Sequence, residues 1–142
     1  MIVQFTPEQI SEQWGTIKDA IVASLNKNTE DKDKASNVIL QNLLANAMQC
    51  WAVIVDNNVN SIMITAFMYT PTGVKSLMIY TMYVYNPTEN IDWLSAYEEL
   101  KKYAVSKGCK NIVAYISNPK LLAILKHIEH IKEIFVTIPI GG

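Results

Sequence analysis

Histidine and cysteine are the side chains of this sequence that most readily act as nucleophiles or metal ligands. His127 and His130 stand three residues apart, a spacing that brings two imidazoles to one metal ion if both lie on one helix. Ile128 and Ile131 interleave with them, and no third ligand is indicated elsewhere in the sequence. A polar helix end explains the pair better, so no metal site is expected.

The two cysteines, Cys50 and Cys109, form no CxxC motif and are too few for a disulfide framework. Cys109 with either histidine would make a nucleophile and a base, but it follows Gly108 at the start of an expected buried strand. Nothing at that position activates a thiol. We expect both cysteines to be buried packing residues, and no catalytic residue is assigned.

Length and composition predict one globular domain over residues 1–142, because 16.0 kDa with 50% hydrophobic residues suits a single apolar core. No apolar run reaches the roughly 18 residues that a membrane span needs, so no membrane association is expected. The first residues lack the basic and apolar pattern of a secretory signal, which predicts synthesis inside a cell.

The charge of the chain argues against nucleic acid as a partner. The net charge is −1, and all 12 basic residues are lysines. Phosphate backbones require a basic face, and bidentate recognition of phosphate or guanine requires arginine. The abundance of Ile, Asn, Lys and Tyr indicates an A/T-rich genome.

The elements that must position any site begin with helices. Met1–Phe5 reads as a short strand, and Thr6-Pro7-Glu8-Gln9 is a capping box with proline at the first helical position. The apolar spacing continues that one helix to Leu25. A charged loop is expected over Asn26–Lys34, and a second helix over Ser36–Met48.

The middle of the chain changes to the pattern of strands. Turn residues separate three expected strands, Trp51–Val55, Val59–Tyr69 and Lys75–Tyr85. Short connections predict that they pair in order as an antiparallel meander. The middle strand is apolar almost throughout Ile62–Met68, so helices must cover both faces of the sheet.

The last part of the chain alternates helices and strands. A third helix is expected from near Asn86–Asn90 to Lys107, with Gly108 as its left-handed C-cap. A strand over Asn111–Ile116, a fourth helix opened by Asn118-Pro119 and a strand over Ile134–Ile140 complete the chain. The fold class is therefore α/β (α+β), with a mixed, mostly antiparallel twisted sheet in the order β-α-α-β-β-β-α-β-α-β.

This order resembles the GNAT acyltransferase superfamily over essentially the whole chain. Its best local feature is Asn111–Asn118, which is similar to the fifth strand of the family and the asparagine that opens its fourth helix. The resemblance implies a GNAT-like fold.

The resemblance also implies a cofactor turn, in which a glycine-rich segment holds the pyrophosphate of coenzyme A at a helix N-terminus. The corresponding segment here, Tyr85–Trp93, contains no glycine, lysine or arginine. Pro87 removes one N–H donor, and Glu89 and Asp92 bring carboxylates that repel a diphosphate. We therefore assign no cofactor-binding residue and expect no cofactor.

Two further positions depart from the family. The fourth strand, Ser76–Val84, lacks the carboxylate that many members use as general base. The position seven residues past Asn118, where members often carry an acid tyrosine, is Leu125. These departures favour a fold that has lost its chemistry.

The chain also resembles small acyltransferase-like virion proteins of short-tailed bacteriophages, which are comparable in length and end in two glycines, as Gly141-Gly142 does here. The main hypothesis is therefore a non-enzymatic bacteriophage protein in the virion or the host cytoplasm. It would act by protein–protein interaction with a viral or host protein or with a second copy. Methionines and tyrosines of the central hairpin would be mostly core, with a share available as an interface.

The alternative is a divergent acyl-CoA-dependent N-acyltransferase, with acetyl-CoA as the cofactor in that case alone. Tyr80, Tyr83 and Tyr115 then become the candidates for proton transfer, because they lie near the expected splay between the fourth and fifth strands.

Overall fold

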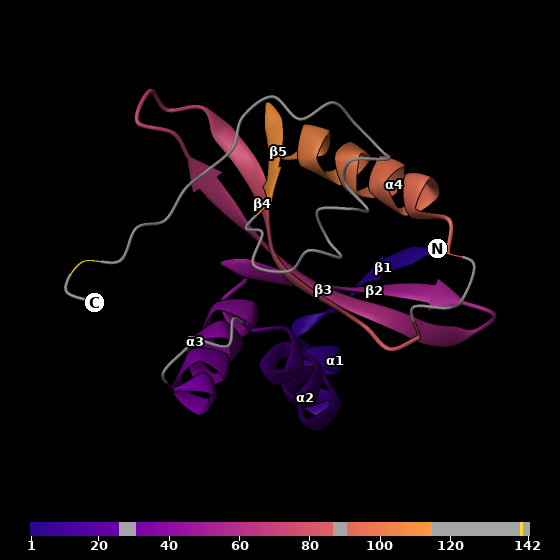
Figure 1. Cartoon of the computed structure of the whole chain (residues 1–142). Helices are drawn as coiled ribbons and strands as arrows, with labels where there is room; N and C mark the ends of the chain where they lie inside the picture. The colour runs from indigo at the N-terminus through magenta and orange to yellow at the C-terminus, as the bar shows by residue number, and fades with distance from the viewer. Residues whose placement is uncertain (26–30, 87–90, 115–139, 141–142) are drawn as a thin grey trace.

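A five-stranded sheet with helices on both faces forms the described part of the computed structural model, which covers residues 1–25, 31–86, 91–114 and 140 (Figure 1). The elements in chain order are β1 (Ile2–Gln4), α1 (Pro7–Glu12), α2 (Trp14–Ser24), α3 (Lys32–Leu44), β2 (Met48–Val55), β3 (Asn58–Tyr69), β4 (Lys75–Val84), α4 (Trp93–Ser106) and β5 (Asn111–Ala114). Among the described helices, none is both long and apolar enough to cross a membrane.

The strands lie in the order β1-β2-β3-β4-β5, so each strand pairs with its neighbour in sequence. The first four strands pair antiparallel, which confirms the predicted meander of β2, β3 and β4. The last pair is parallel, with Ser76 of β4 opposite Asn111 of β5 and Ile79 opposite Ala114. The sheet is therefore mixed and mostly antiparallel, as the sequence predicts.

The middle strand β3 is buried on both faces. Ile62 and Ile64 point into a cluster formed with α1, α2 and α3, whereas Met63 packs in a second cluster with α4. Figure 1 shows α1, α2 and α3 on one side of the sheet and α4 on the other. This arrangement confirms the prediction that helices cover both faces.

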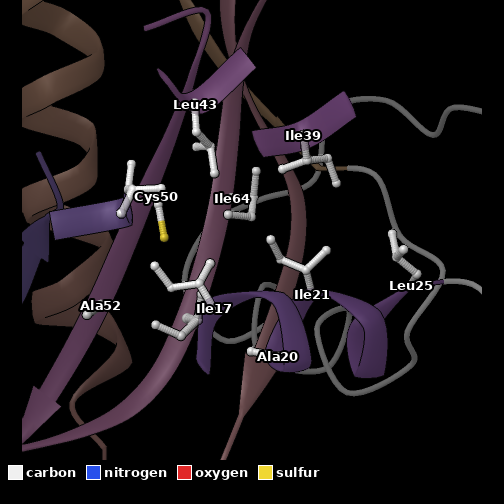
Figure 2. Close-up of a cluster of buried hydrophobic side chains, with 11 residues drawn as sticks. Ile17, Ala20, Ile21, Leu25, Ile39, Leu43, Cys50, Ala52 and Ile64 are labelled. Carbon is white, nitrogen blue, oxygen red and sulfur yellow. The ribbon is translucent and has the colours of Figure 1, made fainter. Parts of the chain in front are cut away.

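The larger cluster fills the space between the sheet and the first three helices (Figure 2). Ile17 and Ile21 of α2 and Leu43 of α3 meet Cys50 and Ile64 of the strands, and all five side chains are almost completely buried. Burying an aliphatic side chain of this size stabilises a fold by about 1.5–3 kcal/mol. These contacts hold α2 and α3 against the centre of the sheet.

The second cluster holds α4 on the opposite face. Leu100 and Ala104 of α4 belong to the same cluster as Trp51, and the Trp51 ring meets Tyr103 edge to face, with centroids 4.8 Å apart. Beside them, Trp51 Nε1–H donates to Thr65 Oγ1 at 2.9 Å, and the Thr65 hydroxyl donates to Gln49 Oε1 at 2.8 Å. These hydrogen bonds satisfy the polar groups of Thr65 and Gln49, so both side chains can be buried between the sheet and α4.

The sequence predicts one continuous first helix, and this prediction is wrong. The segment breaks at Gln13 into two helices, α1 and α2. Gln13 has φ −102° and ψ 13°, outside the helical region, although its N–H still bonds to Gln9 O at 2.9 Å. The predicted loop also ends too late, because Lys32–Lys34 already belong to α3. The Asp31 carboxylate caps that helix by accepting the Lys34 N–H at 2.9 Å.

The predicted end of the second helix at Met48 is wrong as well, since α3 ends at Leu44 and β2 begins at Met48. Asn46 adopts a left-handed conformation with φ 60°. The Asn46 N–H then bonds to Leu43 O at 3.2 Å, and the Ala47 N–H bonds to Asn42 O at 2.8 Å. These two bonds are a Schellman motif, in which asparagine stands where glycine is usual.

The same motif ends α4, and here it confirms the prediction. Gly108 has φ 79°, and the Cys109 N–H bonds to Ala104 O at 2.9 Å. The predicted start near Asn86–Asn90 is wrong, because Asp92 is the N-cap and the helix begins at Trp93.

Some predicted elements fall beyond the described ranges. These are the fourth helix opened by Asn118-Pro119, residues 134–139 of the strand predicted over Ile134–Ile140, and the last two residues of the predicted strand Asn111–Ile116, whose described part ends at Ala114.

Two glycines make a matched test of the Schellman motif. A Cβ added at Gly108 or at Gly15 meets no atom within 4 Å, so only the backbone conformation distinguishes them. We expect Gly108→Ala to lower the free energy of unfolding by about 1 kcal/mol, because φ 79° strains alanine. Gly15→Ala, inside α2, should raise it by about 0.5 kcal/mol. Urea denaturation measures both, and shifts in the same direction would contradict this account.

Candidate functional site

One extra residue interrupts the pairing of β4 with β3. Ile64 of β3 lies opposite Thr81, but the next residue, Thr65, lies opposite Ile79. Tyr80 is therefore a β-bulge. Because a bulge puts two consecutive side chains on one face, Tyr80 and Thr81 both point toward the layer of α1, α2 and α3. The Thr81 hydroxyl donates to the Ser24 carbonyl oxygen of α2 at 3.3 Å.

The bulge follows directly on the last described pair between β4 and β5. That parallel pairing runs from Ser76 to Ile79, where it meets Ala114. Within the described ranges, no strand continues beside Thr81–Val84 on the β5 side. Backbone N–H and C=O groups are obligatory hydrogen-bonding groups, and in general the edge of a sheet can bind an extended chain that contains amides.

The bulge also brings two of the three candidate tyrosines to one face. Side chains three residues apart in a regular strand point to opposite faces, but Tyr80 and Tyr83 are both half-buried against the cluster of α1, α2 and α3. The third candidate, Tyr115, lies outside the described residues.

Sequence reasoning missed Tyr85, which adjoins this group. Its ring meets Tyr83 edge to face, with centroids 5.0 Å apart and an interplanar angle of 87°. Burial raises the pKa of Tyr85, and the nearby Tyr83, Cys50 and Asp19 raise it further. Asp19 is an exposed residue of α2, and its charge acts on Tyr85, whereas β4 itself carries no carboxylate.

The N-terminus of α4 is closed by a carboxylate from its own chain. Asp92 Oδ1 accepts the Ser95 N–H at 3.0 Å, as an N-cap does. The sequence predicted an acid at this helix start, and Asp92 confirms it. The other two residues of that prediction, Pro87 and Glu89, lie outside the described residues.

Both cysteines are buried, as expected. Burial raises the pKa of the Cys50 thiol from 9.0 to about 12, so this thiol is protonated at neutral pH. Burial also raises the pKa of Cys109, and Lys75 partly opposes that shift. Neither environment activates a thiolate nucleophile.

Among the described residues, no three His, Cys, Asp or Glu side chains form a group that could hold a metal ion. His127 and His130 lie outside those residues.

Solved structures share this fold over almost the whole chain, whereas no family model and no curated protein matches the sequence. A probable acetyltransferase matches with a TM-score of 0.69 at 13% identity, covering 100% of this chain and 99% of its own. A ribosomal-protein-alanine N-acetyltransferase from Brucella melitensis biovar Abortus 2308 matches with a TM-score of 0.68 at 15% identity, covering 98% of each chain.

An aminoglycoside N-acetyltransferase in complex with CoA also matches, with a TM-score of 0.59 at 12% identity, covering 99% of this chain and 94% of its own. At these identities the likeness establishes the fold, and the chain has a GNAT-like fold as predicted.

The main functional hypothesis, a non-enzymatic bacteriophage protein that acts by protein–protein interaction, is contradicted. The structural neighbours named above are acetyltransferases, and two of them are N-acetyltransferases. They favour the alternative that the sequence left open. That hypothesis depended on the missing motif residues and on the resemblance to bacteriophage virion proteins, and neither could reveal the bulge at Tyr80.

The raised pKa of Cys50 predicts a pH-dependent contribution to stability. The folded thiol stays protonated up to about pH 12, whereas the unfolded thiol ionises near its model value of 9.0. The Cys50 thiol therefore makes its full contribution to the free energy of unfolding below pH 9, and this contribution is lost as the pH rises toward 12. In urea denaturation at several pH values, the stability difference between wild type and Cys50→Ala should narrow over this interval. If the stability difference between wild type and Cys50→Ala stayed constant over this interval, burial would not raise the pKa of Cys50.

Proposed function

We propose that this chain is an N-acyltransferase that transfers an acyl group from a coenzyme A thioester to an amine. The observation that carries the proposal is the bulge at Tyr80. It directly follows the last described pair of β4 with β5, and it brings Tyr80 and Tyr83 to one face. The neighbouring folds support the same reaction class, since two of those named above are N-acetyltransferases.

The described residues fit one part of coenzyme A and not another. The pantetheine arm contains two amides and ends in the thioester, and the edge of Thr81–Val84 offers backbone groups to such a chain. The diphosphate would meet the carboxylate of Asp92 at the N-terminus of α4, so that end does not fit it. Coenzyme A supplies an activated acyl group through its thioester bond.

The reaction requires that the acyl group be oriented toward the amine and that one proton be moved from the amine nitrogen and one be supplied to the leaving sulfur. The amine nitrogen forms a bond to the acyl carbon, the carbon–sulfur bond breaks, and a proton lost by the nitrogen balances the one gained by the sulfur. Backbone groups of β4 beyond the bulge orient the acyl carbonyl. The Tyr83 hydroxyl is proposed to pass a proton to the leaving sulfur, and the edge-to-face contact with Tyr85 holds the Tyr83 ring in place.

The test measures thiol release from acetyl-CoA with a panel of amines, namely a peptide with N-terminal alanine, the aminoglycoside sisomicin and spermidine. At least one amine should accelerate thiol release, and mass spectrometry should find the acetylated amine. Tyr83→Phe should lower kcat about 10²-fold or more, because it removes one hydroxyl that takes part in proton transfer.

Tyr69→Phe is the matched control. Tyr69 ends β3 at the other end of the sheet and is 63% exposed, so this variant should keep the wild-type kcat. If no amine in the panel accelerated thiol release, the proposed reaction would lose its support. If Tyr83→Phe kept the wild-type kcat, as Tyr69→Phe should, the proposal that Tyr83 takes part in proton transfer would be wrong.

A further inference from the structure

We infer that the acceptor is a diamine or polyamine, and that its second ammonium group binds at Asp19 and Tyr85 while its first nitrogen receives the acyl group. The inference rests on the proposed function and names the class of acceptor. It follows from the surface that Tyr83 and Tyr85 form with Asp19 of α2, which we call the tyrosine–aspartate surface.

Tyr85 follows the last residue of β4, and hydrogen bonds fix its backbone. The Tyr85 N–H donates to the Asn60 carbonyl oxygen at 2.8 Å, and Asn60 Nδ2 donates to the Asn86 carbonyl oxygen at 3.2 Å. The Tyr85 ring packs edge to face against Tyr83, with centroids 5.0 Å apart. Tyr85 nevertheless stays 41% exposed. A fixed and partly exposed aromatic ring can bind an ammonium group, which is attracted to the face of the ring.

Helix α2 runs beside β4 and carries the acidic part of the tyrosine–aspartate surface. The Thr81 hydroxyl donates to the Ser24 carbonyl oxygen at 3.3 Å, so the last turn of α2 lies beside the bulge. Asp19 comes five residues before Ser24, about 7.5 Å toward the start of the helix at 1.5 Å per residue. Burial raises the pKa of Tyr85, and the charge of Asp19 adds to this shift. The helix and the strand therefore run in opposite directions, with Asp19 toward Tyr85.

Among the described residues, no lysine forms an ion pair with Asp19. Lys18, its neighbour in sequence, pairs with Asp33 of α3 at 3.4 Å instead. The segment Tyr80–Tyr85 contains no lysine, and Asp19 itself is exposed. A carboxylate beside an aromatic ring attracts a cation through both its charge and the ring face, and it offers a neutral group no such attraction.

The bound cation is the second nitrogen of the acceptor and not the reacting one. The reacting nitrogen needs a free electron pair to attack the acyl carbon, whereas a second alkylamine nitrogen stays protonated at neutral pH, as a lysine does. Tyr83 and Tyr85 are two residues apart, about 7 Å along an extended chain. The nitrogens of an extended 1,4-diaminobutane have a similar separation. Such an acceptor can present one nitrogen near Tyr83, where the proton is transferred, and the other to Tyr85 and Asp19.

The test compares kcat/KM for 1,4-diaminobutane and for 4-aminobutan-1-ol, with acetyl-CoA as the donor. The two acceptors have the same length, but a hydroxyl replaces the second ammonium group in the amino alcohol. The wild type should prefer the diamine about 10-fold, which exceeds the factor of two expected from its two equivalent nitrogens. If the amines were acetylated with a ratio of two or less, this inference alone would be overturned. If neither these amines nor the panel above accelerated thiol release, the proposed function would fail, and the inference with it.

Variants of the tyrosine–aspartate surface should change this preference, and the ratio of the two acceptors cancels any effect on the proton transfer that both need. Asp19→Asn removes the charge at nearly constant size and should lower the preference about fivefold. Tyr85→Leu removes the ring and should lower it by a similar factor, whereas Tyr85→Phe keeps the ring and should retain the preference. Wild-type preference in Asp19→Asn, or loss of the preference in Tyr85→Phe, would contradict the inference.

Glu99→Gln is the matched control for the loss of one negative charge. Glu99 is an exposed residue of α4, on the opposite face of the sheet, and it pairs with Lys102 at 3.4 Å. This variant should keep the wild-type preference for the diamine. An equal reduction in Glu99→Gln and Asp19→Asn would show that the net charge of the chain sets the preference, and would overturn the role of Asp19.

Discussion

The extra residue in β4 determines which face every later side chain of that strand takes. Before it, Leu77 and Ile79 pack in the cluster with α4; after it, Tyr83 packs against the cluster of α1, α2 and α3. In a strand without the bulge, Tyr83 would share the face of Ile79, and Tyr80 would lie on the opposite face. The two tyrosines meet on one side because of the bulge.

The burial of β3 keeps this bulge in position. Ile64 is fully buried opposite Thr81, and on the other face Thr65 is buried in a chain of hydrogen bonds between Trp51 and Gln49. Sliding β4 by one residue would carry apolar side chains out of one cluster and into the other, which both packed faces oppose. The helices packed on the two faces of the sheet therefore define the geometry of the β4 edge.

Much of the fold follows from local sequence signals, because helix spacing, turn residues and the capping box act over a few residues. The helix ends that the sequence did not predict depend on backbone conformations that more than one residue type can adopt. Asn46, for example, adopts the left-handed conformation at the end of α3. The bulge at Tyr80 left no signal, since Leu77–Tyr83 is an almost unbroken apolar run in which one added residue disturbs no pattern. The site is a property of pairing between strands, and missing motif residues therefore misdirected the functional hypothesis.

The central claim is that the edge of β4 beyond the bulge holds the acyl donor. Amide hydrogen exchange, resolved to single residues and measured with and without saturating acetyl-CoA, tests it directly. The account predicts slower exchange in Thr81–Val84 with the donor, and unchanged exchange in α3 on the far side of the larger cluster. Unchanged exchange in Thr81–Val84, whether or not other amides respond, would contradict it.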